Sequence, residues 1–325
     1  MADVFAYLKG FGASSGSPNK STIIVTAPTG STVTCKMGST TKTATEKNGA
    51  WTFGGLDLGT WTITSAKGGD SATQDVVITR LTVEYVTIVY RITPEFTYTG
   101  DYEIVDDSDN PISDFANWKN NWKIRFLTSG TFTVTKLNGW NGQLDVFLVG
   151  GGGNGETVRG ARGGGGGYTK TVKGVSIAIA TPYTITIGAS SGTSSAFGAS
   201  ANGASGVNGG SGGGGGGSSS GTSGDGGSNG GNGTAGNVSQ GGTGQGTTTR
   251  EFGESTGKLY SGGGGGSAAG AGAAGDSTAG AGAAYGGAAK NGVANTGGGG
   301  GAAYSGTAGR GGSGIVIARN ARRAA

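Results

Sequence analysis

The glycine content of the C-terminal half is the feature that most restricts what this chain can fold into. Fifteen of the 77 glycines precede residue 150, so 62 lie within the last 176 residues. Collagen is excluded because glycine does not recur at every third position and the last proline is Pro182. A flexible linker is the other usual explanation, but single aromatic residues interrupt the glycine runs and apolar, strand-like segments bound the region. The composition therefore favours a folded body built from glycine, with flexible polypeptide as the alternative.

The overall composition excludes several classes of protein. Charged residues make up only 13% of the chain, and its net charge of +4 is too small and scattered to indicate a nucleic-acid partner. The chain has no histidine, which excludes histidine-dependent triads and imidazole metal ligands. Its single cysteine, Cys35, cannot form an internal disulfide. No secretory signal pattern or membrane-length apolar run is present, so we expect a protein that is made in a cytoplasm and released by a route other than secretion, without membrane insertion.

The first third of the chain has the pattern of a small β-sandwich. We divide it into an N-terminal arm (1–20), a sandwich of immunoglobulin-like or PEGA-like type (21–93) and a polar connector (94–122). Short threonine-rich strands, separated by Asn-Gly and Gly-Gly turn signals, are expected to begin at Thr22, Thr32, Trp51, Thr60 and Asp75. Their large apolar residues Trp51, Phe53, Trp61 and Ile63 are expected in the core.

Residues 123–325 are expected to form one glycine-rich domain. Apolar segments 123–127, 131–135 and 143–149 lead into the first glycine run, and 168–172, 182–188 and 314–319 follow later runs. We interpret these segments as strands of one sheet platform. The glycine-rich stretches are then excursions that leave the platform and return to it.

Ordering glycine costs more conformational entropy than ordering any other residue, so a glycine body needs a regular bonding pattern. The polyproline-II helix has three residues per turn, a rise of about 3.1 Å and no internal hydrogen bonds. Without side chains, several such helices can pack together and satisfy each other's N–H and C=O groups. We therefore predict an all-β protein whose platform carries a bundle of polyglycine-II helices.

The polar residues that interrupt the glycine runs are the candidates for binding a partner molecule. Segment 143–149 leaves the platform, so the turn at 154–159 is expected at the distal end of the bundle. The candidates there are Asn154, Glu156, Thr157 and Arg159. Candidates in later turns, whose end of the bundle the sequence leaves open, are Asp276, Thr278, Lys290 and Asn291. The single aromatics of the region have two interpretations, as plugs that close the bundle or as platforms for sugar rings.

Two clusters of acidic residues are candidates for metal binding or catalysis. The cluster Asp106, Asp107, Asp109 and Asn110 could bind Ca²⁺, but it lacks the spacing of a calcium loop, and a solvated turn before Pro111 is the simpler interpretation. Glu251 and Glu254 could be a glycosidase pair, but no apolar pocket accompanies them. We expect no catalytic residues, no metal, no cofactor and no enzymatic activity.

Four blocks occur in order: DVFLVGGGG (145–153), GGGGGYTKT (163–171), YTITIG (183–188) and GGSGIVI (311–317). This set resembles the glycine-rich domain of phage and prophage tail-fibre and tail-tip proteins. Segments VTAPTGSTVT (25–34) and GTWTIT (59–64) look like the small sandwich that often precedes it. Together the two resemblances cover roughly 20–92 and 126–319.

The resemblance implies a structural protein of the virion, located in the tail or another external appendage, that acts as a receptor-binding adhesin in host attachment. Its implied partners are other tail, baseplate or virion proteins and a bacterial surface receptor, either carbohydrate or protein. It carries over no receptor-contacting residues. Homotrimers are common in tail fibres, and a monomer that caps another fibre is the other option.

Two alternatives to the adhesin remain at this point. One is a non-adhesive structural component of the virion, such as a capsid-decorating fibre or a spacer. The other is an ice-binding glycine protein, which the irregular spacing of the runs disfavours. Because the chain has no coiled-coil or collagen-like shaft, a compact tip suits it better than a long fibre.

Overall fold

The computed structural model describes residues 20–27, 29–67, 70–88, 93–118, 120–138, 140–210, 213–214, 224, 234–235 and 249–322. The predicted arm lies outside these residues, apart from Lys20. The chain divides into two compact units, 1–93 with 138–140 and 94–137 with 141–325. Each unit is described by itself.

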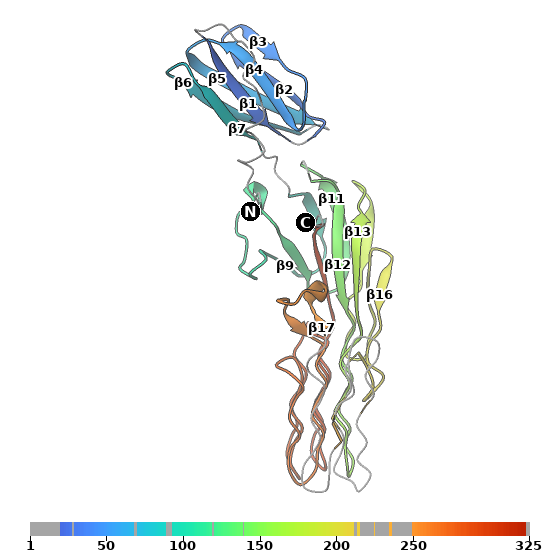
Figure 1. Ribbon diagram of the computed structural model, residues 1–325. Coiled ribbons are helices and arrows are strands. Elements are labelled where there is room, and N and C mark those ends of the chain that lie inside the picture. The colour runs from blue at the N-terminus through green and yellow to red at the C-terminus, as the bar shows by residue number, and fades with distance from the viewer. Residues whose placement is uncertain are drawn as a thin grey trace. The chain divides into compact units, whose positions relative to one another are not determined.

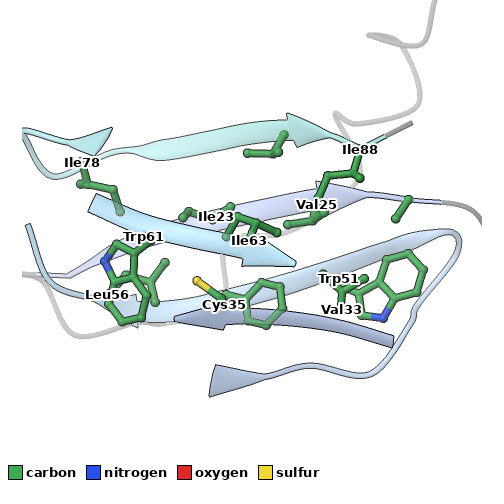
Figure 2. Packing of buried hydrophobic residues seen from close by; sticks show 13 residues of the cluster. Ile23, Val25, Val33, Cys35, Trp51, Leu56, Trp61, Ile63, Ile78 and Ile88 are labelled. Atoms are coloured by element: carbon green, nitrogen blue, oxygen red, sulfur yellow. The ribbon is translucent and has the colours of Figure 1, made fainter. Parts of the chain in front are cut away.

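The first unit is the predicted β-sandwich. Its strands are β1 (Ser21–Thr26), β2 (Thr32–Met37), β3 (Thr40–Thr43), β4 (Ala50–Leu56), β5 (Gly59–Lys67), β6 (Asp70–Ile78) and β7 (Val83–Thr87). They form a three-stranded sheet, β4-β1-β7, and a four-stranded sheet, β3-β2-β5-β6. Trp51, Phe53, Trp61 and Ile63 are all buried, which confirms the predicted core. Figure 2 shows Trp51, Trp61 and Ile63 among the strands. Successive side chains of a strand point to opposite faces, so the alternation of these apolar residues with threonine turns one face of the strand toward the core.

The second unit contains the remaining strands. They are β8 (Glu95–Tyr98), β9 (Tyr102–Val105), β10 (Lys123–Phe126), β11 (Gly130–Lys136), β12 (Gln143–Val149), β13 (Thr169–Ser176), β14 (Pro182–Ile185), β15 (Ser194–Ala196), β16 (Ala199–Ala201), β17 (Thr249–Arg250), β18 (Leu259–Tyr260) and β19 (Ile315–Asn320). Two short 3₁₀ turns, Phe115–Asn117 and Glu251–Gly253, complete it. The main sheet has the order β13-β12-β19-β10-β9, and a second sheet has the order β14-β11-β8.

The two sheets of this unit pack face to face through aromatic rings. The ring centroid of Phe126 on β10 lies 5.5 Å from Phe132 on β11 and 4.8 Å from Tyr98 on β8. The closing strand β19 is inserted between β12 and β10, with both of which it pairs antiparallel. The strand that ends the glycine excursion therefore lies beside the strand that begins it.

Residues 94–122, expected to be a connector, contribute two strands to these sheets. β8 pairs with β11, and β9 pairs with β10. Both strands have only four residues and are flanked by polar segments, so their own sequence does not determine which strands they pair with. Ring packing of Phe96 on β8 against Phe132, with centroids 5.1 Å apart, fixes the strand in place. Nonlocal packing decides this segment's structure more than its own propensity does.

The glycine-rich segments run side by side away from the strands (Figure 1). Their hydrogen bonds recur every three residues toward the same neighbour. The N–H groups of Gly152 and Gly155 donate to the carbonyl oxygens of Gly312 and Gly309, at 2.9 and 3.0 Å. Likewise, Gly164 and Gly167 donate at 2.8 Å to positions 300 and 297 of another run. A period of three is the number of residues per turn of a polyproline-II helix.

Glycine is required here because neighbouring backbones approach closely. A Cβ atom on Gly164 would lie 2.0 Å from the carbonyl oxygen of Gly153, and one on Gly152 would lie 2.1 Å from that of Gly298. Both distances are far below carbon–oxygen contact distance, so a side chain at either position would force the runs apart. The polyglycine-II interpretation concerns backbone torsions and stays a prediction, which the three-residue period supports.

Candidate functional site

The turns between glycine runs lie at two ends of the bundle. Thr278 marks the end near the sheets, because its Oγ1 accepts a hydrogen bond from Gly262, which follows β18 closely. The other end, away from the strands, contains four described turns: 154–162, 268–271, 284–287 and 303–307. We call these the distal turns. Backbone bonds join them, since Ala303 donates to Glu156 and Ser267 donates to Ala161.

The most exposed large hydrophobic side chain among the described residues, Tyr285, lies on a distal turn. Gly287 N–H donates to Ala284 C=O at 3.0 Å, and Gly286 has a φ of +77°, as in a type II turn. Tyr285 is then the second residue of the turn, and its side chain is 71% exposed. Its ring lies 5.0 Å from that of Tyr304 on the neighbouring distal turn, with the planes inclined by 51°. The two rings form one aromatic pair at the distal end.

Three other aromatics of the region are packed into the platform. Phe252 and Tyr260 are buried, and their rings lie 5.8 and 5.4 Å from Phe147 of β12. The ring of Phe197 lies 5.3 Å from that of Tyr183 on β14. These residues act as plugs, whereas Tyr285 and Tyr304 do not. The plug interpretation therefore fits the buried aromatics, and the sugar-platform interpretation of Tyr285 and Tyr304 stays a prediction.

The first distal turn holds the four candidates predicted there. The Asn154 side-chain oxygen accepts hydrogen bonds from Ser190 Oγ at 2.7 Å and from Gly311 N–H at 2.9 Å, so it helps to fix the turn. Glu156 Oε1 lies 2.7 Å from Arg162 Nη2. Burial raises the pKa of Glu156, but the hydrogen bonds from Arg162 outweigh it and hold that pKa below its usual value.

The remaining two candidates of that turn, Thr157 and Arg159, are exposed, as is their neighbour Val158. The backbone of Thr157 forms a bridge to Ala303. Within the described part of the chain, no carboxylate lies within ion-pair distance of Arg159. A cationic side chain and an apolar one thus point to solvent from a turn with a fixed backbone.

The later candidates do not lie on the distal turns. Asp276 and Thr278 form a compact turn at the sheet end, where Asp276 Oδ1 accepts from the Thr278 N–H at 2.7 Å and Thr278 is buried. Lys290 and Asn291 are exposed on a run along the side of the bundle. Asn291 Oδ1 accepts from the Arg310 N–H at 2.8 Å, which joins two adjacent runs.

A charged cavity of about 600 Å³ lies at the opposite end, against the main sheet. Its lining residues are Asp107, Ser108, Asp109, Lys123, Glu251, Glu254, Thr256, Gly257, Lys258, Arg319 and Arg322. Lys123 and Arg319 are cross-strand neighbours on β10 and β19 and therefore share one face of the sheet. The segment that follows β17 covers this face and supplies the two glutamates.

Ion pairs fill this cavity region. Lys123 Nζ lies 2.6 Å from Asp109 Oδ1 and 3.0 Å from Glu251 Oε1, and both Lys123 and Glu251 are buried. Arg319 Nη2 lies 2.6 Å from Glu254 Oε1, and its guanidinium stacks over a phenylalanine ring. The hydrogen bond from Arg319 lowers the pKa of Glu254. Both glutamates of the pair are bound to basic residues of the main sheet, so we interpret them as a clamp that ties the 251–258 segment to the sheet.

The acidic cluster before Pro111 is likewise built into the structure. Asp106 Oδ1 accepts from the N–H groups of Ser108 and Asn110, at 2.8 and 2.9 Å, in a closed turn. Asp107 pairs with Arg322, and Asp109 pairs with Lys123. Among the described residues, no three His, Cys, Asp or Glu side chains come together as a metal site would require.

Comparison with known families identifies the second unit. The profile of a family described as "Glycine-rich domain" matches residues 127–321, more than half of the chain, and the chain belongs to this family. No curated protein matched the chain in a sequence search. In the part of the chain that the structure describes, no helix has the length and apolarity needed to cross a bilayer.

Proposed function

We propose that this member of the glycine-rich domain family is a structural phage virion protein, a tail-fibre or tail-tip adhesin that attaches to a bacterial surface receptor. The observation that carries the proposal is the pair of the exposed Tyr285 and the half-buried Tyr304 at the distal end of the hydrogen-bonded bundle. The four glycine-rich blocks resemble those of tail-fibre proteins, and this resemblance supports the assignment to a phage virion. The adhesive surface consists of the distal turns, and Thr157, Val158 and Arg159 lie on the turn that is bonded to the turn of Tyr304.

The architecture suits a recognition surface. A protein loses affinity when it must order flexible loops on binding, and a preformed surface avoids that cost. Here the turns are joined by backbone hydrogen bonds such as that from Ala303 to Glu156. Tyrosine adds a large contact area with only two rotatable side-chain bonds, which is why it is common in binding surfaces.

The rest of the chain has an assembly role in this proposal. The platform anchors both ends of the glycine excursion, and the sandwich attaches the protein to other tail, baseplate or virion proteins. The protein is made in the host cytoplasm and acts in the virion. It needs no cofactor and no catalytic step.

Adsorption of the labelled full-length protein to a panel of bacterial strains tests this function. Saturable binding to at least one strain is expected. The triple variant V158S/R159S/Y285S should lose at least tenfold in apparent affinity, since central aromatic contacts each contribute about 2 kcal/mol or more. A matched variant, R80S/L81S/Y85S, removes exposed side chains of the same kinds from the sandwich and should bind normally.

Circular dichroism and denaturation midpoints of both variants should equal those of the parent protein. Equal adsorption by the parent protein and the distal-turn variant would refute an adhesive role for these turns. A folded protein that enters virions but binds no cell would instead assign it to the non-adhesive structural components.

A further inference from the structure

We propose that the ligand of the distal turns is an anionic polysaccharide of the bacterial surface, bound with a sugar ring on Tyr285 and with basic side chains around it. This inference rests on the proposed adhesive function and names its ligand class. It starts from the aromatic pair. The face of an aromatic ring is negative, so it attracts the polarised C–H groups on one side of a sugar ring.

The geometry of the pair favours small rings over a protein surface. The planes of Tyr285 and Tyr304 are inclined by 51°, so they present ring faces in two directions. Beside them, Val158 is the one other large apolar side chain that the described distal turns expose. A stable protein interface buries about 800 Å² on each partner around an apolar centre. The remaining residues of the distal turns are mostly glycine, alanine and serine, which offer backbone and hydroxyl groups to sugar hydroxyls instead.

The charge on this part of the bundle selects an anionic glycan. Segments 154–162 and 284–310 contain four basic residues, Arg159, Arg162, Lys290 and Arg310, and one acidic residue, Glu156. Glu156 is paired with Arg162. Three cationic side chains therefore remain, of which Arg159 lies on a distal turn and the other two lie exposed on adjacent runs. A surface with one sign of charge attracts a polymer of the opposite sign and speeds its capture.

Single variants separate the contribution of the aromatic ring from the contribution of the positive charge. Y285S should weaken binding to polysaccharide extracted from an adsorbing strain by about 30-fold, the loss expected for a central aromatic anchor. Y285W keeps an aromatic face and should bind within about threefold of the parent. R159Q should weaken binding by about three- to fivefold at low salt and little at high salt, as for a charge at the edge of an interface. The control variants Y85S and R80Q should match the parent protein.

The chemistry of the cell surface is tested in parallel with the full-length protein. Periodate, which cleaves the vicinal diols of sugars, should abolish adsorption, and proteinase K should leave it intact. Reduction of carboxylates or hydrolysis of phosphodiesters should weaken binding to the extracted polysaccharide. Whichever treatment does so identifies the anion.

The failure of this inference differs from the failure of the proposed function. Adsorption that survives periodate and is lost with proteinase K would overturn the glycan while leaving the adhesin in place. Binding to the polysaccharide that Y285S does not weaken, or that survives both removal of carboxylates and removal of phosphates, would overturn it as well. If the parent protein adsorbs to no strain, the adhesive function itself fails, and the inference fails with it.

Discussion

Replacement of Gly164 by alanine is predicted to destabilise the glycine bundle severely. Gly164 lies on the second run, and an added Cβ would come within 2.0 Å of the carbonyl oxygen of Gly153 on the first run. The same residue is bonded on two other sides. Its N–H donates to Gly300 and its carbonyl accepts from Gly264, both at 2.8 Å. No direction of movement relieves the collision without disturbing one of these contacts.

The magnitude follows from the required displacement. A carbon atom and a carbonyl oxygen rest about 3.3 Å apart at closest, so the runs must separate by about 1.3 Å. A hydrogen bond of 2.8 Å stretched by that amount is no longer a bond. Loss of one such buried bond leaves an N–H and a C=O group unsatisfied, and at about 1–3 kcal/mol for each group the destabilisation is about 2–6 kcal/mol.

The matched control is G286A on a distal turn. Gly286 has open space around its Cα, and its φ of +77° is the single obstacle to a side chain. That backbone conformation costs an L-residue about 1–2 kcal/mol. Guanidinium unfolding gives the free energies, and hydrogen exchange of peptides from 150–170 assigns the effect to the bundle rather than to the sandwich. A free energy of unfolding for G164A within about 1 kcal/mol of the parent protein would refute the close-packing argument.

Three further predictions concern the backbone, pH and the thiol. A crystal structure should show φ near −75° and ψ near +145° in 163–167, the polyproline-II values; extended β torsions would contradict the polyglycine-II interpretation. Because Arg319 lowers the pKa of Glu254, this carboxylate's contribution to stability is complete above its unfolded pKa of about 4.3 and is lost as the pH falls through the lower folded value. Denaturation midpoints should therefore fall between pH 5 and pH 3, and less so in E254Q; parallel profiles would contradict the ion pair. Burial raises the pKa of Cys35 to about 11, so iodoacetamide at pH 8 should modify it far more slowly in the native protein than in denaturant, and equal rates would contradict its burial.

The parts of the fold that local patterns determine could be predicted from the sequence. Threonine alternating with Trp61 and Ile63 specifies a strand with one buried face, and the structure buries both residues. The place of β19 between β12 and β10 could not be predicted, because an apolar segment gives no information about its distant partners. β8 and β9 were missed for the same reason, since four-residue strands depend on the sheets that receive them.

The candidate site could be predicted only near its first turn. A strand that leaves the platform and a glycine run of known length place 154–159 at the far end. Each later turn reverses the direction, so one uncertain turn leaves the end of every following turn open, as it does for Asp276 and Thr278. The sequence did contain a signal for Tyr285, because a tyrosine followed by two glycines fits the second position of a type II turn.

The same packing that makes the bundle rigid also restricts where it can recognise anything. At positions such as Gly152 and Gly164, a Cβ would lie about 2 Å from a neighbouring carbonyl oxygen, so these interior positions admit no side chain and offer no group that a ligand could recognise. Specificity must therefore come from turns and outward positions, where side chains have space. Of the two sets of turns, the one at the sheet end is committed to holding the platform, as the buried Thr278 shows. The distal turns are left as the part of this unit in which residues can change without altering the body that presents them.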